Sequence, residues 1–201
     1  MQQLLLFGEM EGRPPLPPLA EERDVVFYAL LLGPQLWAPV SRLVTAQREG
    51  HGITGRMRPT DTFHISVLGF GFADELDDDD LELAAAVAAD ITIEPFEVSF
   101  PELISWEAKK KTGQPCPLVL PCDTGRTEIL RLGAKLTAGL IARGFRPRSF
   151  MPHEPHLTLL CDSVRVPKTP LAQPITAQVE GFSLVYSHRG EGRYTVLWPQ
   201  H

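Results

Sequence analysis

The stretch Phe63-His64-Ile65-Ser66-Val67 decides the interpretation of this chain, because it recurs in kind at Pro155-His156-Leu157-Thr158-Leu159. In both stretches apolar and polar residues alternate, and turn-forming residues precede them, which predicts two short β-strands. Alternation puts the histidine and the hydroxyl residue of each stretch on one face, about 6.6 Å apart along the strand. Each predicted strand therefore presents an imidazole beside a hydroxyl.

Two such strands have the groups needed for an in-line displacement at phosphorus without a metal. One histidine takes the proton of attacking water and the other protonates the leaving oxygen. We therefore predict His64 and His156 as catalytic residues, and Ser66 and Thr158 as residues that bind the non-bridging phosphate oxygens.

A single His-x-Ser tetrapeptide would carry little weight, since a histidine on a half-buried strand is more often structural. The prediction depends on the pair. The two histidines lie 92 positions apart (156 minus 64), and each follows a helical pattern, a glycine and an Arg-Pro segment. This common order indicates a degenerate internal duplication.

The tandem motif resembles that of the two-histidine (2H) phosphoesterase superfamily, in the branch of 2'-5' RNA ligases and RNA 2',3'-cyclic phosphodiesterases. The resemblance covers roughly residues 24 to 199, from a first strand at Val25 to a closing hairpin that ends at Pro199. Two positions depart from the family pattern. Ser66 stands where threonine is more usual, and Leu160-Cys161 follows the second motif, where many members have an arginine.

The resemblance implies a metal-independent cyclic phosphodiesterase that opens 2',3'-cyclic phosphate ends of RNA, or a small cyclic nucleotide, to a 2'-phosphate. In reverse, the same site would perform 2'-5' ligation. His64 would serve as the acid to the leaving 3'-oxygen and His156 as the base to water. No cofactor is expected, the partner is an RNA 3' end or a small cyclic nucleotide, and we expect a monomer without an obligate protein partner.

The expected fold is α+β, with two pseudo-symmetric lobes of antiparallel sheet, helices on their outer sides and a central cleft. Residues 1–23 form a Pro-rich arm and residues 24–201 one bilobal domain. Residues 163–174 are expected to form a loop. Apolar periodicity predicts strands at 25–32, 93–100, 103–106, 118–120, 176–187 and 193–198, and helices at 36–48, 81–89 and 124–143.

Further substrate contacts are expected next to the motifs. Arg56 and Arg58 lie in the glycine-rich loop before the first motif, and Arg148 lies before the second. An arginine fork binds two phosphate oxygens at once. Tyr28 and Tyr194 are candidate contacts for the substrate, with Tyr194 a candidate platform for a base. Solvated loop arginines and tyrosines that pack against neighbouring strands are the alternative interpretation.

Composition limits the class of protein. A net charge of -6 excludes broad electrostatic affinity for nucleic acid, so any RNA contact is local. Three cysteines form no disulfide framework typical of a secreted domain. No signal-peptide pattern and no apolar stretch of membrane-span length occurs, which predicts a cytoplasmic protein without membrane contact.

Two other classes stay open. His153, His156 and Cys161 are residue types that bind zinc, although Cys161 would point to the opposite face of the strand from His156. The acidic run Asp77 to Asp80 is a weaker candidate for magnesium, and its position before a helical pattern favours a helix start. The second class is a non-catalytic sensor that uses the same two histidines to bind a nucleotide or phosphate.

Overall fold

The computed structural model describes residues 23–106, 115–147 and 154–199. Residues 1–22 of the predicted Pro-rich arm, together with Arg148 and His153, lie outside the described residues. Within them, the strands are β1 (Val25–Leu31), β2 (His64–Phe72), β3 (Phe96–Ser105), β4 (Cys116–Pro121), β5 (His156–Asp162), β6 (Thr169–Val179), β7 (Ser183–His188) and β8 (Arg193–Trp198). The helices are α1 (Trp37–His51), α2 (Asp78–Ala89) and α3 (Arg126–Ala142), with 3-10 turns η1 (Pro34–Leu36), η2 (Thr60–Thr62) and η3 (Ala73–Glu75).

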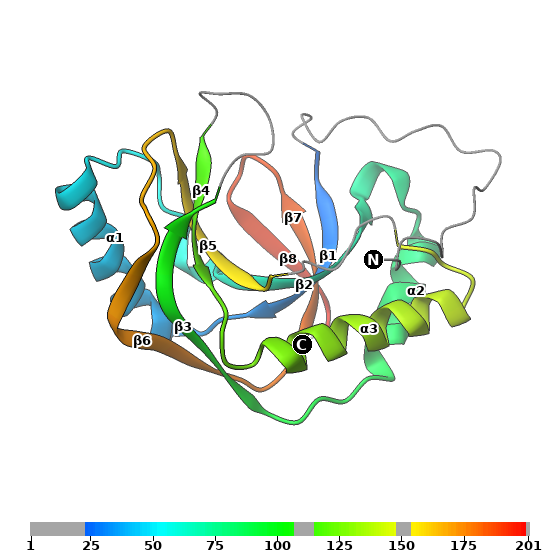
Figure 1. The fold of residues 1–201 in the computed structure, drawn as a ribbon. Helices are drawn as coiled ribbons and strands as arrows, with labels where there is room; N and C mark the ends of the chain where they lie inside the picture. Colours follow the sequence, from blue (N-terminus) through cyan, green and yellow to red (C-terminus); the bar gives the residue numbers. More distant parts are fainter. Residues whose placement is uncertain (1–22, 107–114, 148–153, 200–201) are drawn as a thin grey trace, which may run out of the picture.

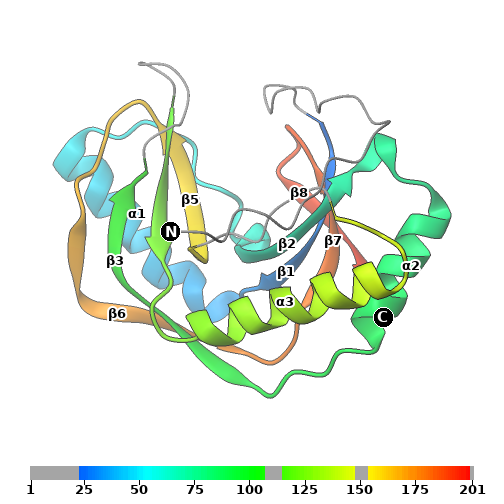
Figure 2. The same ribbon diagram turned by 45° about the vertical axis from the view of Figure 1, so that its right-hand side comes forward.

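The eight strands form one antiparallel sheet in the order β6-β3-β4-β5-β2-β1-β7-β8. The predicted α+β class and antiparallel pairing are confirmed, but the strands form one sheet where two were expected. Its two four-stranded halves meet between β5 and β2, where the register contains a single pair, Ile65 with Leu157. Figures 1 and 2 show these halves on the two sides of the β5-β2 junction. Both histidine motifs therefore lie at the centre of the sheet.

The two central strands share a local irregularity. β1 pairs with β2 on both sides of Val67 but skips that residue, and β4 pairs with β5 on both sides of Leu159 but skips it. Each skipped residue lies three positions after its histidine. Such a bulge lets two consecutive side chains point into the core, and both Val67-Leu68 and Leu159-Leu160 are buried. The similarity of the two motifs thus extends to their backbone.

The helices tie the two halves together. α1 follows β1 in the chain, yet it lies beside the half that contains β3 and β6, and the turn η1 before it contacts β6 (Figures 1 and 2). α3 follows β4 but packs against β2 of the other half, while α2 contacts α3, β7 and β8. Each half is therefore covered by a helix whose preceding strand belongs to the other half.

Two helix starts and one loop show how local chemistry sets the boundaries. Asp77 caps α2 by accepting a hydrogen bond of 2.9 Å from the Asp80 backbone N–H, so the acidic run begins the helix three residues earlier than expected. α3 begins after Gly125, not at Thr124, because Gly125 has φ of 84° and lies against the Glu97 carbonyl. Part of the expected loop 163–174 is strand, since β6 starts at Thr169 and pairs with β3.

Candidate active site

The fold brings the two predicted histidines to one place. His64 is the first residue of β2 and His156 the first residue of β5, and these antiparallel neighbours pair at the next position of each. In an antiparallel ladder the residues that flank such a pair lie across from each other. Extending that register by one position puts His64 across from Thr158, and Ser66 across from His156, on one face of the sheet. All four side chains are half-buried, whereas Ile65 and Leu157 between them are fully buried in the core.

Both imidazoles are held in the same way. Nδ1 of His64 lies 2.9 Å from the carbonyl oxygen of Thr62, and Nδ1 of His156 lies 2.9 Å from the carbonyl oxygen of Glu154. A carbonyl oxygen only accepts, so Nδ1 carries the hydrogen in each ring. In the neutral ring Nε2 then has the free lone pair. Each histidine therefore offers Nε2 as its proton acceptor or, when charged, as its donor.

Aromatic side chains pack on both histidines. The ring of His64 contacts Phe27 at a centroid distance of 5.2 Å and Tyr194 at 5.2 Å, and the Tyr194 hydroxyl oxygen lies 3.1 Å from its Nδ1. The ring of His156 contacts Trp106 at 4.3 Å. Trp106 was not expected at the site from sequence, because only the tertiary fold brings the end of β3 beside the start of β5. Tyr194 lies beside His64, and its predicted contact with a substrate stays a prediction.

Arg58 joins the site through the loop before β2. Its backbone N–H donates to the carbonyl of Leu159 in β5 at 2.8 Å, which fastens the loop to the second motif strand. Its side chain is exposed, and its positive charge adds to the lowering of the pKa of His64 and His156 and opposes the rise that burial causes in the pKa of Tyr194. The guanidinium is thus an electrostatic neighbour of all three rings. Arg56 is exposed in the same loop, and its predicted contact stays a prediction.

Burial dominates the electrostatics of the histidine pair. It lowers the pKa of His64 to about 4, against the opposing hydrogen bond to Thr62, and the charges of Arg58 and His156 lower it further. The pKa of His156 is also lowered, first by burial, while the hydrogen bond and charge of Glu154 oppose the shift. Both rings are therefore neutral near pH 7 in the free protein. A bound anion would favour the protonated form of either ring.

One expected substrate contact is wrong. The side chain of Tyr28 is 0% exposed, and its hydroxyl donates to the carbonyl oxygen of Ala84 at 3.0 Å. A ring enclosed in the core has no surface for a substrate, so Tyr28 is a structural residue that ties β1 to α2. The sequence placed it in a continuous apolar run, which does not distinguish one face of a strand from the other.

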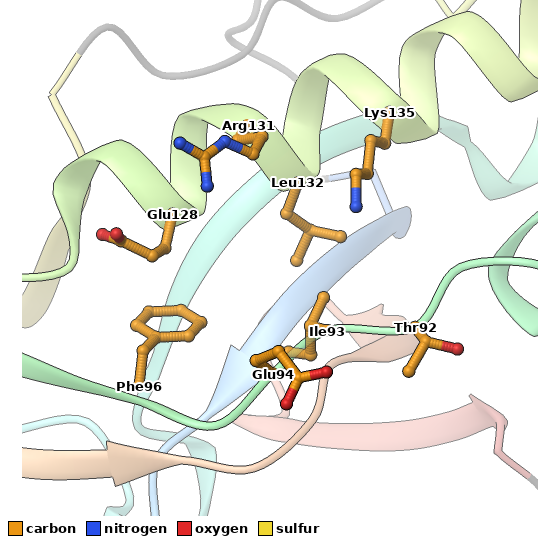
Figure 3. A pocket seen from close by; sticks show the side chains of 8 residues that line it. All are labelled: Thr92, Ile93, Glu94, Phe96, Glu128, Arg131, Leu132 and Lys135. Carbon is orange, nitrogen blue, oxygen red and sulfur yellow. The ribbon is translucent and has the colours of Figure 1, made fainter.

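The described residues provide no cluster of three or more metal-binding side chains. Asp77 and Asp80 form a helix cap, and Cys161 is exposed on β5. A surface pocket of about 270 Å³ lies elsewhere, between α3 and residues 92–96 (Figure 3). Its lining mixes Arg131 and Lys135 with Glu94 and Glu128 and includes no residue of either motif. None of the helices in the described part of the chain is long and apolar enough to cross a membrane.

Comparison with known structures shows that the chain has a LigT-like fold, as its resemblance to the 2H phosphoesterases implied. E. coli LigT in its apo form is 21% identical, with 88% of this chain and 95% of LigT covered and a TM-score of 0.63. The Thermus thermophilus protein TT0787 is 25% identical, with coverages of 86% and 94% and a TM-score of 0.61. A phosphoesterase matches at 20% identity, with coverages of 87% and 94% and a TM-score of 0.59.

Related crystals of E. coli LigT contain NADP+ or 3'-AMP, and they match this chain with TM-scores of 0.59 and 0.55. No protein-family model and no curated protein sequence matches the chain. The likeness to known proteins is therefore one of three-dimensional fold.

Proposed function

We propose that this protein is a metal-independent cyclic phosphodiesterase that hydrolyses 2',3'-cyclic phosphate ends of RNA, or a related small cyclic nucleotide, to a 2'-phosphate. One observation carries the proposal. His64 and His156 start adjacent antiparallel strands, and each uses Nδ1 to bond the carbonyl two residues before it. Two Nε2 atoms are thereby left for proton transfer on the two sides of one phosphate.

The finer architecture belongs to the same proposal. The two halves of the sheet would form two pseudo-symmetric lobes with the substrate phosphate in a cleft between them, above the β5-β2 junction. The matched bulges after the two histidines support this symmetry. Crystals of LigT with nucleotides support a nucleotide ligand for a protein of this fold.

In the proposed reaction, Nε2 of His156 removes a proton from water while the water oxygen attacks phosphorus. The bond between phosphorus and the 3'-oxygen breaks, and protonated Nε2 of His64 gives its proton to that oxygen. The products are a 2'-phosphate and a 3'-hydroxyl, with His156 now protonated and His64 neutral. With a 5'-hydroxyl in place of water, the same proton transfers would open the cyclic phosphate to a 2'-5' phosphodiester and a 3'-hydroxyl.

Three further side chains would serve the phosphate. The hydroxyls of Ser66 and Thr158 donate to its non-bridging oxygens, and Arg58 supplies positive charge to the transition state. Many family members have an arginine after the second motif, where this chain has Leu160-Cys161. Arg58 would supply the positive charge in its place, because its backbone is hydrogen-bonded to Leu159 of the same strand. The negative charge of the bound phosphate would also raise the pKa of His64, which supplies the proton that the reaction needs.

A second candidate is a non-catalytic sensor that binds a nucleotide or phosphate at the same histidines. It is favoured by the pKa of His64, about 4, because a general acid with that value is almost wholly unprotonated near pH 7 until an anion binds. Tight nucleotide binding in calorimetry without any turnover would select the sensor.

The deciding experiment is hydrolysis of an oligonucleotide with a 2',3'-cyclic phosphate end, in EDTA, by the wild type and by His64→Ala and His156→Ala. Loss of a general acid or base costs about 10²- to 10⁴-fold. His51→Ala is the matched control, since His51 is an exposed residue at the end of α1. Turnover that collapses in both site variants and persists in the control supports the enzyme. Wild-type protein that is folded and inactive on cyclic ends contradicts it.

A further inference from the structure

The last residue of β5, Asp162, connects three backbone groups through one buried carboxylate. Asp162 is only 5% exposed to solvent. One oxygen, Oδ2, accepts from the backbone N–H groups of Thr54 (2.8 Å) and Gly55, and the other, Oδ1, accepts from Val164 at 2.7 Å. These bonds lower the pKa of Asp162, so the carboxylate stays charged at neutral pH. Asp162 thus joins the end of β5 to the loop before the first motif.

Gly55 lies flush against this strand end. A Cβ atom at position 55 would be 2.3 Å from the carbonyl oxygen of Cys161, closer than any real contact, so only glycine fits without movement. On the other side, the Arg48 guanidinium at the end of α1 donates to the Gly55 carbonyl at 2.9 Å. The loop is therefore held in one position between α1 and β5.

The same loop is fastened again three residues later, where the Arg58 N–H donates to the Leu159 carbonyl at 2.8 Å. Residues 54–58 are thus bound to β5 at two points, Asp162 and Leu159. Between these points the chain has little freedom to rotate or slide. The side chain at the second point is Arg58, the cation that acts on both histidines.

We propose that Asp162 is a positioning residue that holds the 54–58 loop against β5 and thereby aims the Arg58 guanidinium at the phosphate position between His64 and His156. The identification of the anion as a reacting phosphate rests on the proposed function; the placement of the cation does not. A carboxylate suits this role because it only accepts hydrogen bonds. An amide in its place has only one oxygen to accept with, so its NH2 group would face at least one of these backbone N–H donors.

The test compares Asp162→Asn and Arg58→Gln with the wild type by NMR titration of the imidazole C2 protons, with peaks assigned from His64→Ala and His156→Ala. Removing the Arg58 charge raises the pKa of both histidines. Removing the negative charge of Asp162 would by itself lower them. A rise of both pKa values in Asp162→Asn, with no further rise in the double variant, is therefore the result expected if Asp162 acts through Arg58.

Binding of inorganic phosphate, measured by calorimetry, gives a second readout. We expect about a tenfold loss of affinity in either single variant, the loss typical of one charge-assisted hydrogen bond, and no added loss in the double variant. Asp79→Asn, an exposed position in the first turn of α2, is the matched control and should change neither readout. Glu154, which raises the pKa of His156, is intact in all variants.

Gly55→Ala provides a second route, because it displaces the loop without changing any charge and should raise the same two histidine pKa values. If Asp162→Asn does not fold, the histidine pKa values of Gly55→Ala test whether the position of the 54–58 loop sets the effect of Arg58. Unchanged or lowered histidine pKa values together with unchanged phosphate affinity, in a folded variant, overturn the proposal and leave Asp162 a structural strand-end anchor. Neither readout requires turnover, so failure here is distinct from failure of the proposed hydrolase activity.

Discussion

The hydroxyl oxygen of Tyr194 lies 3.1 Å from Nδ1 of His64, although 130 positions separate the two residues. Nδ1 also lies 2.9 Å from the Thr62 carbonyl oxygen. The Nδ1 hydrogen of His64 therefore already has an acceptor, and the tyrosine oxygen is a second one. The Tyr194 ring also stands edge-on to both His64 and Phe27. Tyr194 thus supports His64 by packing first and by hydrogen bonding second.

Tyr194→Phe removes the oxygen and keeps the ring. Because Thr62 still fixes Nδ1, we expect the rate of cyclic phosphate hydrolysis to fall only about 2- to 10-fold, which corresponds to one net hydrogen bond. Steady-state kinetics measure this. Tyr194→Ala, which also removes the packing, should lose more activity than Tyr194→Phe. A loss of a hundredfold or more in Tyr194→Phe would mean that the hydroxyl itself takes part in the chemistry.

The low pKa of His64 predicts a pH-dependent stability. The unfolded chain binds a proton at His64 near pH 6.5 and the folded protein only near pH 4, so this residue makes the fold less stable as pH falls through that window. Between pH 7 and pH 5, the protonation of His64 lowers the free energy of unfolding by at most about 2 kcal/mol. Urea unfolding at both pH values should show a smaller loss in His64→Gln than in the wild type. Equal losses would contradict the low pKa.

Trp106 packs against His156, and burial is the main cause of the lowered His156 pKa. Trp106→Ala opens that face of the ring to water, so we expect the pKa of His156 to rise toward its ordinary value while that of His64 changes less. NMR titration of the two imidazoles measures both. Trp37→Ala is the control, because Trp37 is an exposed tryptophan on α1. An unchanged His156 pKa would show that Trp106 does not shield the ring.

The hydroxyls of Ser66 and Thr158 are expected to bind the phosphate oxygens. Ser66→Ala and Thr158→Val remove them while nearly preserving shape, and each should lower kcat/KM about 10- to 100-fold, as for a hydrogen bond to a charged group. Thr176→Val, at an exposed position of β6, is the control. Wild-type kinetics in both variants would show that neither hydroxyl binds the phosphate. Arg58 would then be the proposed phosphate ligand that remains.

Much of the site was accessible from sequence because strand alternation is a local property. The pattern around His64 and His156 fixed which residues share a face, and the burial of Ile65 and Leu157 follows it. The register of β3 shifts at Pro101, because proline has no backbone N–H to donate to the neighbouring strand. Helix boundaries were less accurate, since the Asp77 cap and the close contact at Gly125 decide where α2 and α3 begin.

What the sequence by itself determined is the pair of His-x-hydroxyl strands and the antiparallel α+β class. The tertiary structure alone decided which distant residues surround them: it buried Tyr28, brought Tyr194 to His64 and Trp106 to His156, and fastened the Arg58 loop to Asp162. The physical reason is the range of the forces. Side-chain alternation depends on neighbouring residues, whereas burial and long-range hydrogen bonds depend on strand order, which sequence periodicity does not encode.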